Sequence, residues 1–166
     1  YLRIDDNLWM YLAEAEKTMK ISGHMLRQGM MGSDFSYEDQ TERTKLFDDY
    51  NYKIVGEDTY NGRKMWVMML DAKPNVEVTY VKRKLWVDME QYVVYHSELY
   101  AKSGKLIKEF NLYEVKKIGD RYYPVNQEMK DKVKQNSYTR IIMTNITLDN
   151  SVPDSTFTMQ NLEKKN

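Results

Sequence analysis

From Tyr50 onward, apolar and polar residues alternate in short segments separated by turn residues, which is the pattern of antiparallel strands joined by hairpins. The clearest hairpin runs out from Tyr50 and returns over 63–71, and its turn is Asn61-Gly62, a dipeptide that readily adopts positive φ. The returning strand, RKMWVMMLD, is apolar on both faces, so both faces must be covered. We expect this strand to lie centrally in a sheet.

The same alternation predicts a series of further strands along the chain. The turns between them contain Ser103-Gly104 and Gly119-Asp120. The pattern therefore predicts a meander whose later strands cover 76–89, 92–101, 105–115, 121–124 and a final stretch, 130–148, before a short turn or one-turn helix at 154–157.

The first fifty residues differ from the rest. Residues 2–12 alternate from the very start, so we expect one strand there and infer that an N-terminal portion of the protein precedes this chain. Residues 24–31 and 36–47 have helix-compatible composition, and Ser36 lies three residues before Asp39, a capping-box variant with aspartate in place of glutamate. We predict two short helices or helical turns in a mainly β protein.

Length and charge limit the number of domains and the kinds of partner that this protein can have. A chain of 166 residues fits one domain, here 1–166, and can bury a substantial core. Basic and acidic residues balance at 25 each, which argues against a nucleic-acid partner. A local basic group, Lys82-Arg83-Lys84, could meet a phospholipid head group, although such charges usually solvate an outer face or protect an edge. No apolar run approaches the roughly 18 residues of a membrane-spanning helix.

Candidate catalytic and metal-binding chemistry is sparse. The sequence has no cysteine, and His24 and His96 stand alone, so we predict no metal site and no cofactor. Four residues, Ser33, Asp34, Ser36 and Asp39, could be read as a catalytic cluster, but serine and aspartate beside a glycine more often cap helices and form turns. We therefore do not expect an enzyme.

Methionine and aromatic residues are abundant. The chain has 12 methionines, 14 tyrosines and 3 tryptophans, and methionine is the flexible side chain that fills irregular apolar space. These residues are either ordinary core or the wall of an adaptable ligand pocket, and composition favours neither interpretation.

One segment carries a family resemblance. Residues 21–39, ISGHMLRQGMMGSDFSYED, follow a Trp-x-Tyr-Leu pattern at 9–12 and resemble the bacterial outer-membrane lipoprotein-sorting (LolA-like) family, in its branch with an MGSDFSYED-type loop. Two departures are Ala13, where the family commonly has proline, and the family's signal peptide, first helix and first strands, which do not occur in this chain. Other matching features follow in the family's order: Tyr50-Asn51-Tyr52, Asn61-Gly62, Trp86-Val87-Asp88, Tyr123-Pro124 and Phe157-Thr158.

The resemblance implies a fold and a function. The fold is a curved antiparallel sheet, an incomplete β-barrel like LolA and LolB, with a helical lid over an apolar cavity that receives acyl chains. We expect Met25, Leu26, Met30, Met31 and Phe35 to line the lid side of this cavity, and Trp9, Tyr11, Trp66 and Met68 to line the sheet side. The loop residues with an expected structural role are Gly32, Ser33, Asp34, Ser36, Tyr37 and Asp39.

The expected function is a periplasmic carrier of lipid or lipoprotein, with lipid acyl chains as ligand and a membrane exporter as a further partner. Three alternatives stay open: an envelope sensor or exporter-accessory domain of the same fold, a lipid-modifying enzyme using Ser33 and Asp34, and an interaction module that pairs through sheet edges as an edge-paired or swapped dimer.

Overall fold

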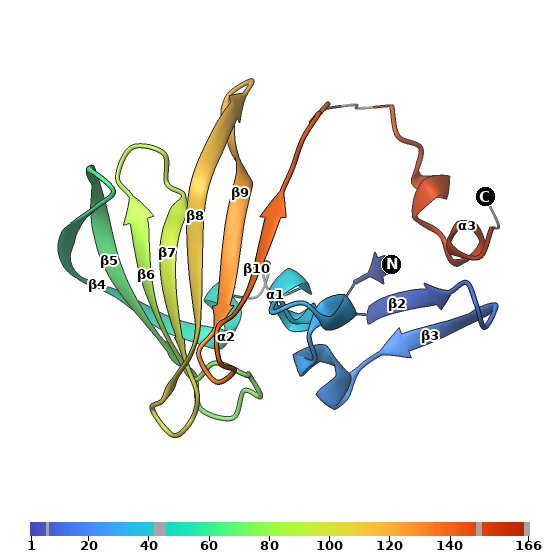
Figure 1. The fold of residues 1–166 in the computed structure, drawn as a ribbon, viewed down its shortest axis with the longest axis horizontal. Coiled ribbons are helices and arrows are strands. Elements are labelled where there is room, and N and C mark those ends of the chain that lie inside the picture. The colour runs from blue at the N-terminus through green and yellow to red at the C-terminus, as the bar shows by residue number, and fades with distance from the viewer. Residues whose placement is uncertain (6, 42–45, 149–150, 165–166) are drawn as a thin grey trace.

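The computed structural model describes residues 1–5, 7–41, 46–148 and 151–164. Within these residues the chain forms two antiparallel sheets, one of three strands and one of seven, with short helical segments beside them (Figure 1). The smaller sheet contains β1 (Leu2–Ile4), β2 (Asn7–Leu12) and β3 (Lys17–Ile21). The larger contains β4 (Tyr50–Tyr60), β5 (Arg63–Ala72), β6 (Lys82–Asp88), β7 (Val94–Tyr100), β8 (Leu106–Ile118), β9 (Arg121–Asp131) and β10 (Ser137–Ile142).

The seven-stranded sheet is a meander in which each strand pairs with its neighbours in sequence, in the order β10 to β4. Register shifts interrupt the pairing in β4–β5, β6–β7, β7–β8 and β8–β9. Because a bulge bends a strand and increases its local twist, these shifts account for a curved sheet that does not close. The predicted mainly β fold with a curved antiparallel sheet that forms an incomplete barrel is confirmed.

The hairpin at Asn61-Gly62 is also confirmed, with φ of 51° and 75° at the two residues. Its returning strand, β5, is paired on both sides but lies next to the edge rather than at the centre. Met65 and Leu70 on β5 are both buried, so two-sided apolarity correctly predicted covered faces.

Several strand predictions are wrong in their extent, including 121–124, which is the start of the longer β9. The predicted strand over 2–12, which includes residue 6 outside the described residues, is a hairpin of β1 and β2 with positive φ at Asp5. Of 76–89, only Lys82–Asp88 pairs as a strand, because the preceding residues lead out of a turn with positive φ at Asn75. The final stretch, 130–148, contains the end of β9, a turn and β10.

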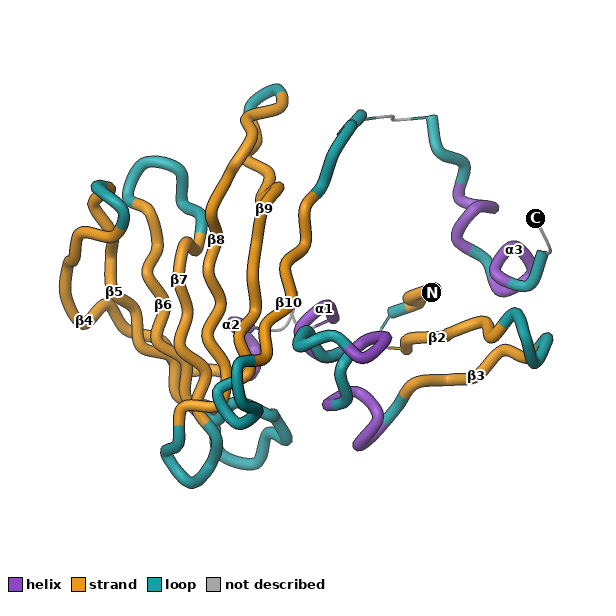
Figure 2. The backbone as a smooth tube through the Cα atoms, viewed as in Figure 1, coloured by secondary structure: helices purple, strands orange, loops and turns teal. Residues whose placement is uncertain are grey.

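Short helical segments connect the two sheets. They are the 3-10 turns η1 (Gly23–Arg27) and η2 (Met30–Gly32) and the helices α1 (Tyr37–Thr41) and α2 (Leu46–Asp49), of which η1, η2 and α1 lie between the sheets (Figure 2). The predicted helical turns are confirmed there, apart from 42–45, which lie outside the described residues.

At the C-terminal end, η4 (Asp154–Phe157) and α3 (Met159–Leu162) follow, as predicted for 154–157. The hydroxyl of Thr18 donates a hydrogen bond of 2.6 Å to Glu163, which joins this end to the β2–β3 hairpin. No described helix is long and apolar enough to cross a membrane.

The edges of the large sheet are β4 and β10. On β4, the side chains of Tyr52 and Ile54 are exposed, and on β10 those of Tyr138 and Ile142 are exposed. Exposed apolar residues on an edge are compatible with pairing between chains, and the edge-paired dimer stays a prediction.

Candidate functional site

The segment 33–39, which joins the two sheets, is set up by local sequence. A Cβ on Gly29 would clash with the Ser33 carbonyl, so the turn before the segment requires glycine there. The Ser36 hydroxyl accepts a hydrogen bond of 3.1 Å from the Asp39 amide, and the Asp39 carboxylate accepts one of 2.7 Å from the Ser36 amide. This reciprocal pair is the predicted capping box, and it starts α1.

Asp34 fixes the segment to the far edge of the large sheet. Its carboxylate accepts hydrogen bonds from Ser137 (2.6 Å) and Thr139 (2.9 Å) on β10. It also forms an ion pair with Lys134, whose amine lies 3.3 Å away. Burial alone would raise the pKa of the Asp34 carboxyl, but these three partners outweigh it and hold that pKa below its ordinary value. The carboxylate is therefore a buried anchor.

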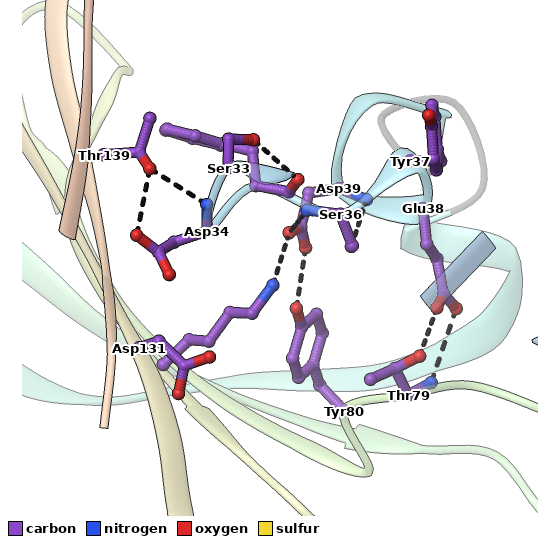
Figure 3. A network of polar contacts seen from close by, with 12 residues as sticks. Ser33, Asp34, Ser36, Tyr37, Glu38, Asp39, Thr79, Tyr80, Asp131 and Thr139 are labelled. Carbon is purple, nitrogen blue, oxygen red and sulfur yellow. Dashed lines mark hydrogen bonds and ion pairs between the residues drawn. The ribbon is translucent and has the colours of Figure 1, made fainter. Parts of the chain in front are cut away.

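Asp39 forms a second anchor nearer the middle of the sheet (Figure 3). It accepts a hydrogen bond of 2.8 Å from the Tyr80 hydroxyl, and Lys108 on β8 lies 3.0 Å from its other oxygen. Burial, together with the adjacent Asp39 carboxylate, raises the pKa of Tyr80 far above its ordinary value. Glu38 adds a third contact, to the amide and hydroxyl of Thr79.

Apolar side chains of the same segment enter two different cores. Phe35 packs with Leu99 and Met129 of the large sheet and with Tyr80 in the loop before β6. Tyr37 packs with Leu8 and Ile21 of the small sheet, and its hydroxyl lies 3.2 Å from that of Tyr1. The segment thus joins the sheets by burying one aromatic residue in each.

Beneath Phe35, one face of the large sheet presents rows of paired residues. Partners in adjacent antiparallel strands share a face. The first row crosses the sheet as Met68, Leu85, Ser97, Phe110, Met129 and Thr139. The next crosses as Leu70, Arg83, Leu99, Lys108, Asp131 and Ser137, and so carries one partner of each aspartate, Ser137 for Asp34 and Lys108 for Asp39.

A pocket of about 330 Å³ lies between this face and the segment above it. Most of its wall is apolar: Phe35, Leu46, Leu85, Val93, Val94, Leu99, Phe110, Leu112, Pro124 and Met129. Its polar wall residues are Asp39, Gln40, Arg83, Ser97 and Gln127. The guanidinium of Arg83 lies 4.9 Å from the ring centre of Tyr50 and 5.0 Å from that of Tyr80, so two aromatic faces flank its charge.

The residues expected to line a cavity are distributed over several places. Phe35 lines the pocket, whereas Met25, Leu26 and Met30 pack against the core of the small sheet, and Met31 is exposed. Met68 packs beside Tyr50 and Leu85, and Trp66 lies against Tyr92. Trp9 lies under Lys20 on the small sheet, whose β2 also carries Tyr11.

The expected loop residues lie together. The Ser33 hydroxyl donates to the Phe35 carbonyl at 3.1 Å, and Gly32 supplies positive φ directly before it. With Asp34, Ser36, Tyr37 and Asp39, every polar group of this loop that we singled out contacts the protein itself.

Sequence reasoning missed most of the pocket wall. Leu85, Leu99, Phe110 and Met129 come from four strands, one residue each from β6 to β9. The strict alternation over 105–115 places Phe110 and Leu112 on the same face as Lys108. This alternation is the sequence pattern that could have indicated part of the pocket wall. Across the described part of the chain, no three His, Cys, Asp or Glu residues are grouped so that they could hold a metal ion.

Comparisons with known proteins agree with this architecture. A DUF1329 family protein from Desulfovibrio piger ATCC 29098 has a similar structure, with a TM-score of 0.88 and 25% sequence identity over 97% of this chain. A putative outer membrane lipoprotein-sorting protein domain from Vibrio parahaemolyticus follows with a TM-score of 0.85 and 20% identity over 95% of this chain. This chain spans 66% of the length of each of these two.

A third structure, LolA superfamily protein NE2245 from Nitrosomonas europaea, has a TM-score of 0.63 and 20% identity over 94% of this chain and 68% of its own. No curated protein matches this sequence. A family model described as "Uncharacterized protein" matches residues 1–164. The chain therefore belongs to this DUF1329-like family, and its fold is shared with LolA-superfamily and outer membrane lipoprotein-sorting domain proteins.

Proposed function

We propose that this chain binds an acyl chain of a lipid or lipoprotein in the pocket beneath residues 33–39, as a carrier of the bacterial cell envelope. The pocket carries this proposal, because ten of its fifteen wall residues are apolar and both the sheet and the segment above it contribute to them. An acyl chain has no directional chemistry, so its binding depends on apolar area that excludes water. Each buried methylene contributes about 0.8 kcal/mol.

The size of the pocket limits its occupant. At about 330 Å³ it is at the small end of ligand pockets, which suits one acyl chain or part of one. The anchors of Asp34 and Asp39 hold the covering segment against the sheet and so keep water from the chain.

A binding role also agrees with the hydrogen bonds that the polar side chains of residues 33–39 form. Ser33 and Asp34 each bond to protein groups, which supports a structural rather than a catalytic role for this pair. Two of the similar structures bear lipoprotein-sorting or LolA-superfamily names, which supports a periplasmic location and lipid or lipoprotein partners. A membrane exporter is a further partner that we propose for such a carrier.

Lipid retention tests the proposal. We expect lipid to co-purify with the protein, as seen by native mass spectrometry, and a fluorescent fatty acid to bind after delipidation. Val94→Trp fills the pocket and should abolish uptake, whereas Val133→Trp, at an exposed turn position, should not. Absence of lipid and of uptake in the unsubstituted protein contradicts the proposal.

Transfer between membranes separates a carrier from a sensor. Donor vesicles loaded with fluorescent lipid should lose it to acceptor vesicles faster in the presence of the protein if it is a carrier. Binding without faster transfer would favour the sensor or accessory role and contradict delivery.

A further inference from the structure

Among the wall residues that the structure describes, Arg83 on β6 is the one cation. Arg83 is 9% exposed, and its guanidinium lies 4.9 Å and 5.0 Å from the ring centres of Tyr50 and Tyr80, which are 2% and 0% exposed. Aromatic faces attract a cation through their quadrupole but carry no opposite charge. The wall of the pocket therefore contains a positive charge that is held in place between two rings.

The carboxylate on the same wall, Asp39, is matched by a different cation. The amine of Lys108 lies 3.0 Å from one of its oxygens, and the two side chains are 13% and 7% exposed. The Ser36 amide and the Tyr80 hydroxyl donate to the same carboxylate. Because Lys108 offsets the charge of Asp39, these two residues and Arg83 together carry one more positive than negative charge.

The strand register places Arg83 at one end of the pocket. Arg83 pairs with Leu99, and the row of Phe110 and Met129 lies two residues further along the strands. Leu112 lies two residues beyond Phe110 on β8. At about 3.3 Å per residue, the wall extends about 13 Å from the row of Arg83 to that of Leu112. The pocket thus has a cationic end, from which a mostly apolar wall continues along the strands.

A guanidinium recognises anions by its geometry as well as by its charge. It presents five N–H donors in a planar fork that matches a carboxylate or a phosphate, and it accepts no hydrogen bond. Five donors exceed what one acceptor group takes up, so a ligand anion can bond to Arg83 alongside protein groups. An anion that enters an apolar pocket loses its hydration at a large cost, and a guanidinium in the wall offsets part of that cost.

We propose that the ligand of this pocket is a single acyl chain with an anionic head, which bonds to the guanidinium of Arg83 while the hydrocarbon lies along the strands over Phe110 and Leu112. This inference rests on the proposed function and adds a chemical class and an orientation to it. The carboxylate of a fatty acid and the phosphate of an alkyl phosphate share this anionic head. A neutral acyl ester lacks it.

Matched ligands and variants test the inference by titration calorimetry on the delipidated protein at pH 8, where carboxylic acids and phosphates are ionised. Decanoic acid and decyl phosphate present the two anionic heads, and methyl decanoate presents a neutral one. Arg83→Met preserves the length of the side chain and removes the charge, whereas Arg83→Lys preserves the charge without the planar fork. Arg121→Met makes the first change at an exposed position of β9 and serves as the control.

We expect the unsubstituted protein to bind at least one of the two anions more tightly than the ester. Arg83→Met should weaken the binding of that anion by about tenfold or more and leave the ester unchanged, because hydrogen bonds to a charged group contribute more than neutral ones. Arg83→Lys should cause a smaller loss, and Arg121→Met none. Dependence of decanoic acid alone on Arg83 would identify a fatty acid, and dependence of decyl phosphate alone a phosphate ester.

An ester that binds the unsubstituted protein as tightly as both anions overturns the inference, and so does an equal loss for all three ligands in Arg83→Met. Thermal unfolding shows whether each variant is folded. If Arg83→Met does not fold, the preference of the unsubstituted protein and the Arg83→Lys variant decide the question. Binding of the ester alone would contradict the anionic head and leave the proposed function standing, whereas binding of none of the three ligands contradicts the proposed function itself.

Discussion

Asp34 and Thr139 bond to each other twice although 105 residues separate them in sequence. The Asp34 amide donates to the Thr139 hydroxyl at 2.9 Å, and that hydroxyl donates to the Asp34 carboxylate at 2.9 Å. Ser137 and Lys134 bond to the other carboxylate oxygen. One side chain therefore joins the connecting segment to the edge strand β10.

Asp34→Ala should lower the free energy of unfolding by about 2–4 kcal/mol, because it leaves Ser137 and Thr139 without their buried acceptor. Urea unfolding measures the change. Asp48→Ala is the control, since no described residue bonds to that exposed carboxylate, and it should change stability by less than about 0.5 kcal/mol. Equal effects of the two substitutions would contradict the anchoring role.

The stability contributed by Asp34 should depend on pH in the acid range. Because the pKa of its carboxyl is lower in the folded state than its ordinary value of 3.8, the contribution is complete above about pH 4 to 5. It is lost as the pH falls through 3.8 toward the folded-state pKa. Urea unfolding at pH 7, 4 and 3 should therefore show a smaller loss for Asp34→Asn than for the unsubstituted protein. A parallel loss in both proteins would contradict this assignment.

Phe35 and Phe47 allow the same substitution at contrasting positions. Phe35 is 3% exposed and packs with Tyr80, Leu99 and Met129, whereas Phe47 is 65% exposed. We expect Phe35→Ala to cost about 3–5 kcal/mol in thermal or urea unfolding and Phe47→Ala less than about 1 kcal/mol. Equal costs would show that Phe35 is not part of the core.

Local features of the fold could be predicted from the sequence. The Asn61-Gly62 turn and the Ser36–Asp39 capping box depend on residues within a few positions of each other, so their composition determines their geometry. The partners of Asp34 could not be predicted, because Ser137 and Thr139 reach it only through the pairing of β10 with β9.

The pocket wall was not predictable for the same reason. Alternation shows that Phe110 and Leu112 share a face, but it does not show that Leu85 and Ser97 lie beside them. The methionines of η1 and η2 lie near Phe35 in sequence, yet Met25 and Met30 pack on the small sheet, because the segment between the sheets contributes to two cores.

Gly62→Ala should destabilise the protein by about 1–2 kcal/mol, because φ at this residue is 75° and a Cβ disfavours that region. The added methyl would meet no atom within 4 Å, so the cost is confined to the backbone. Gly56→Ala is the matched control on the same hairpin: its Cβ also has open space and its φ is not positive. Thermal unfolding should show a lower Tm for Gly62→Ala alone, and similar values for both would rule out backbone strain at the turn.

Tyr80 tests whether the Asp39 anchor contributes beyond packing. Its side chain is fully buried and its hydroxyl donates to Asp39, so Tyr80→Phe preserves the ring and removes one partner of a buried carboxylate. We expect a loss of about 1–3 kcal/mol in urea unfolding, whereas Tyr92→Phe at an exposed position should be neutral. Because the pKa of Tyr80 is raised in the folded state, its contribution is present below the ordinary tyrosine pKa of 10 and is lost as the pH rises above it. Above pH 10 the two proteins should therefore converge in stability, and a constant difference between them would contradict the role of the hydroxyl.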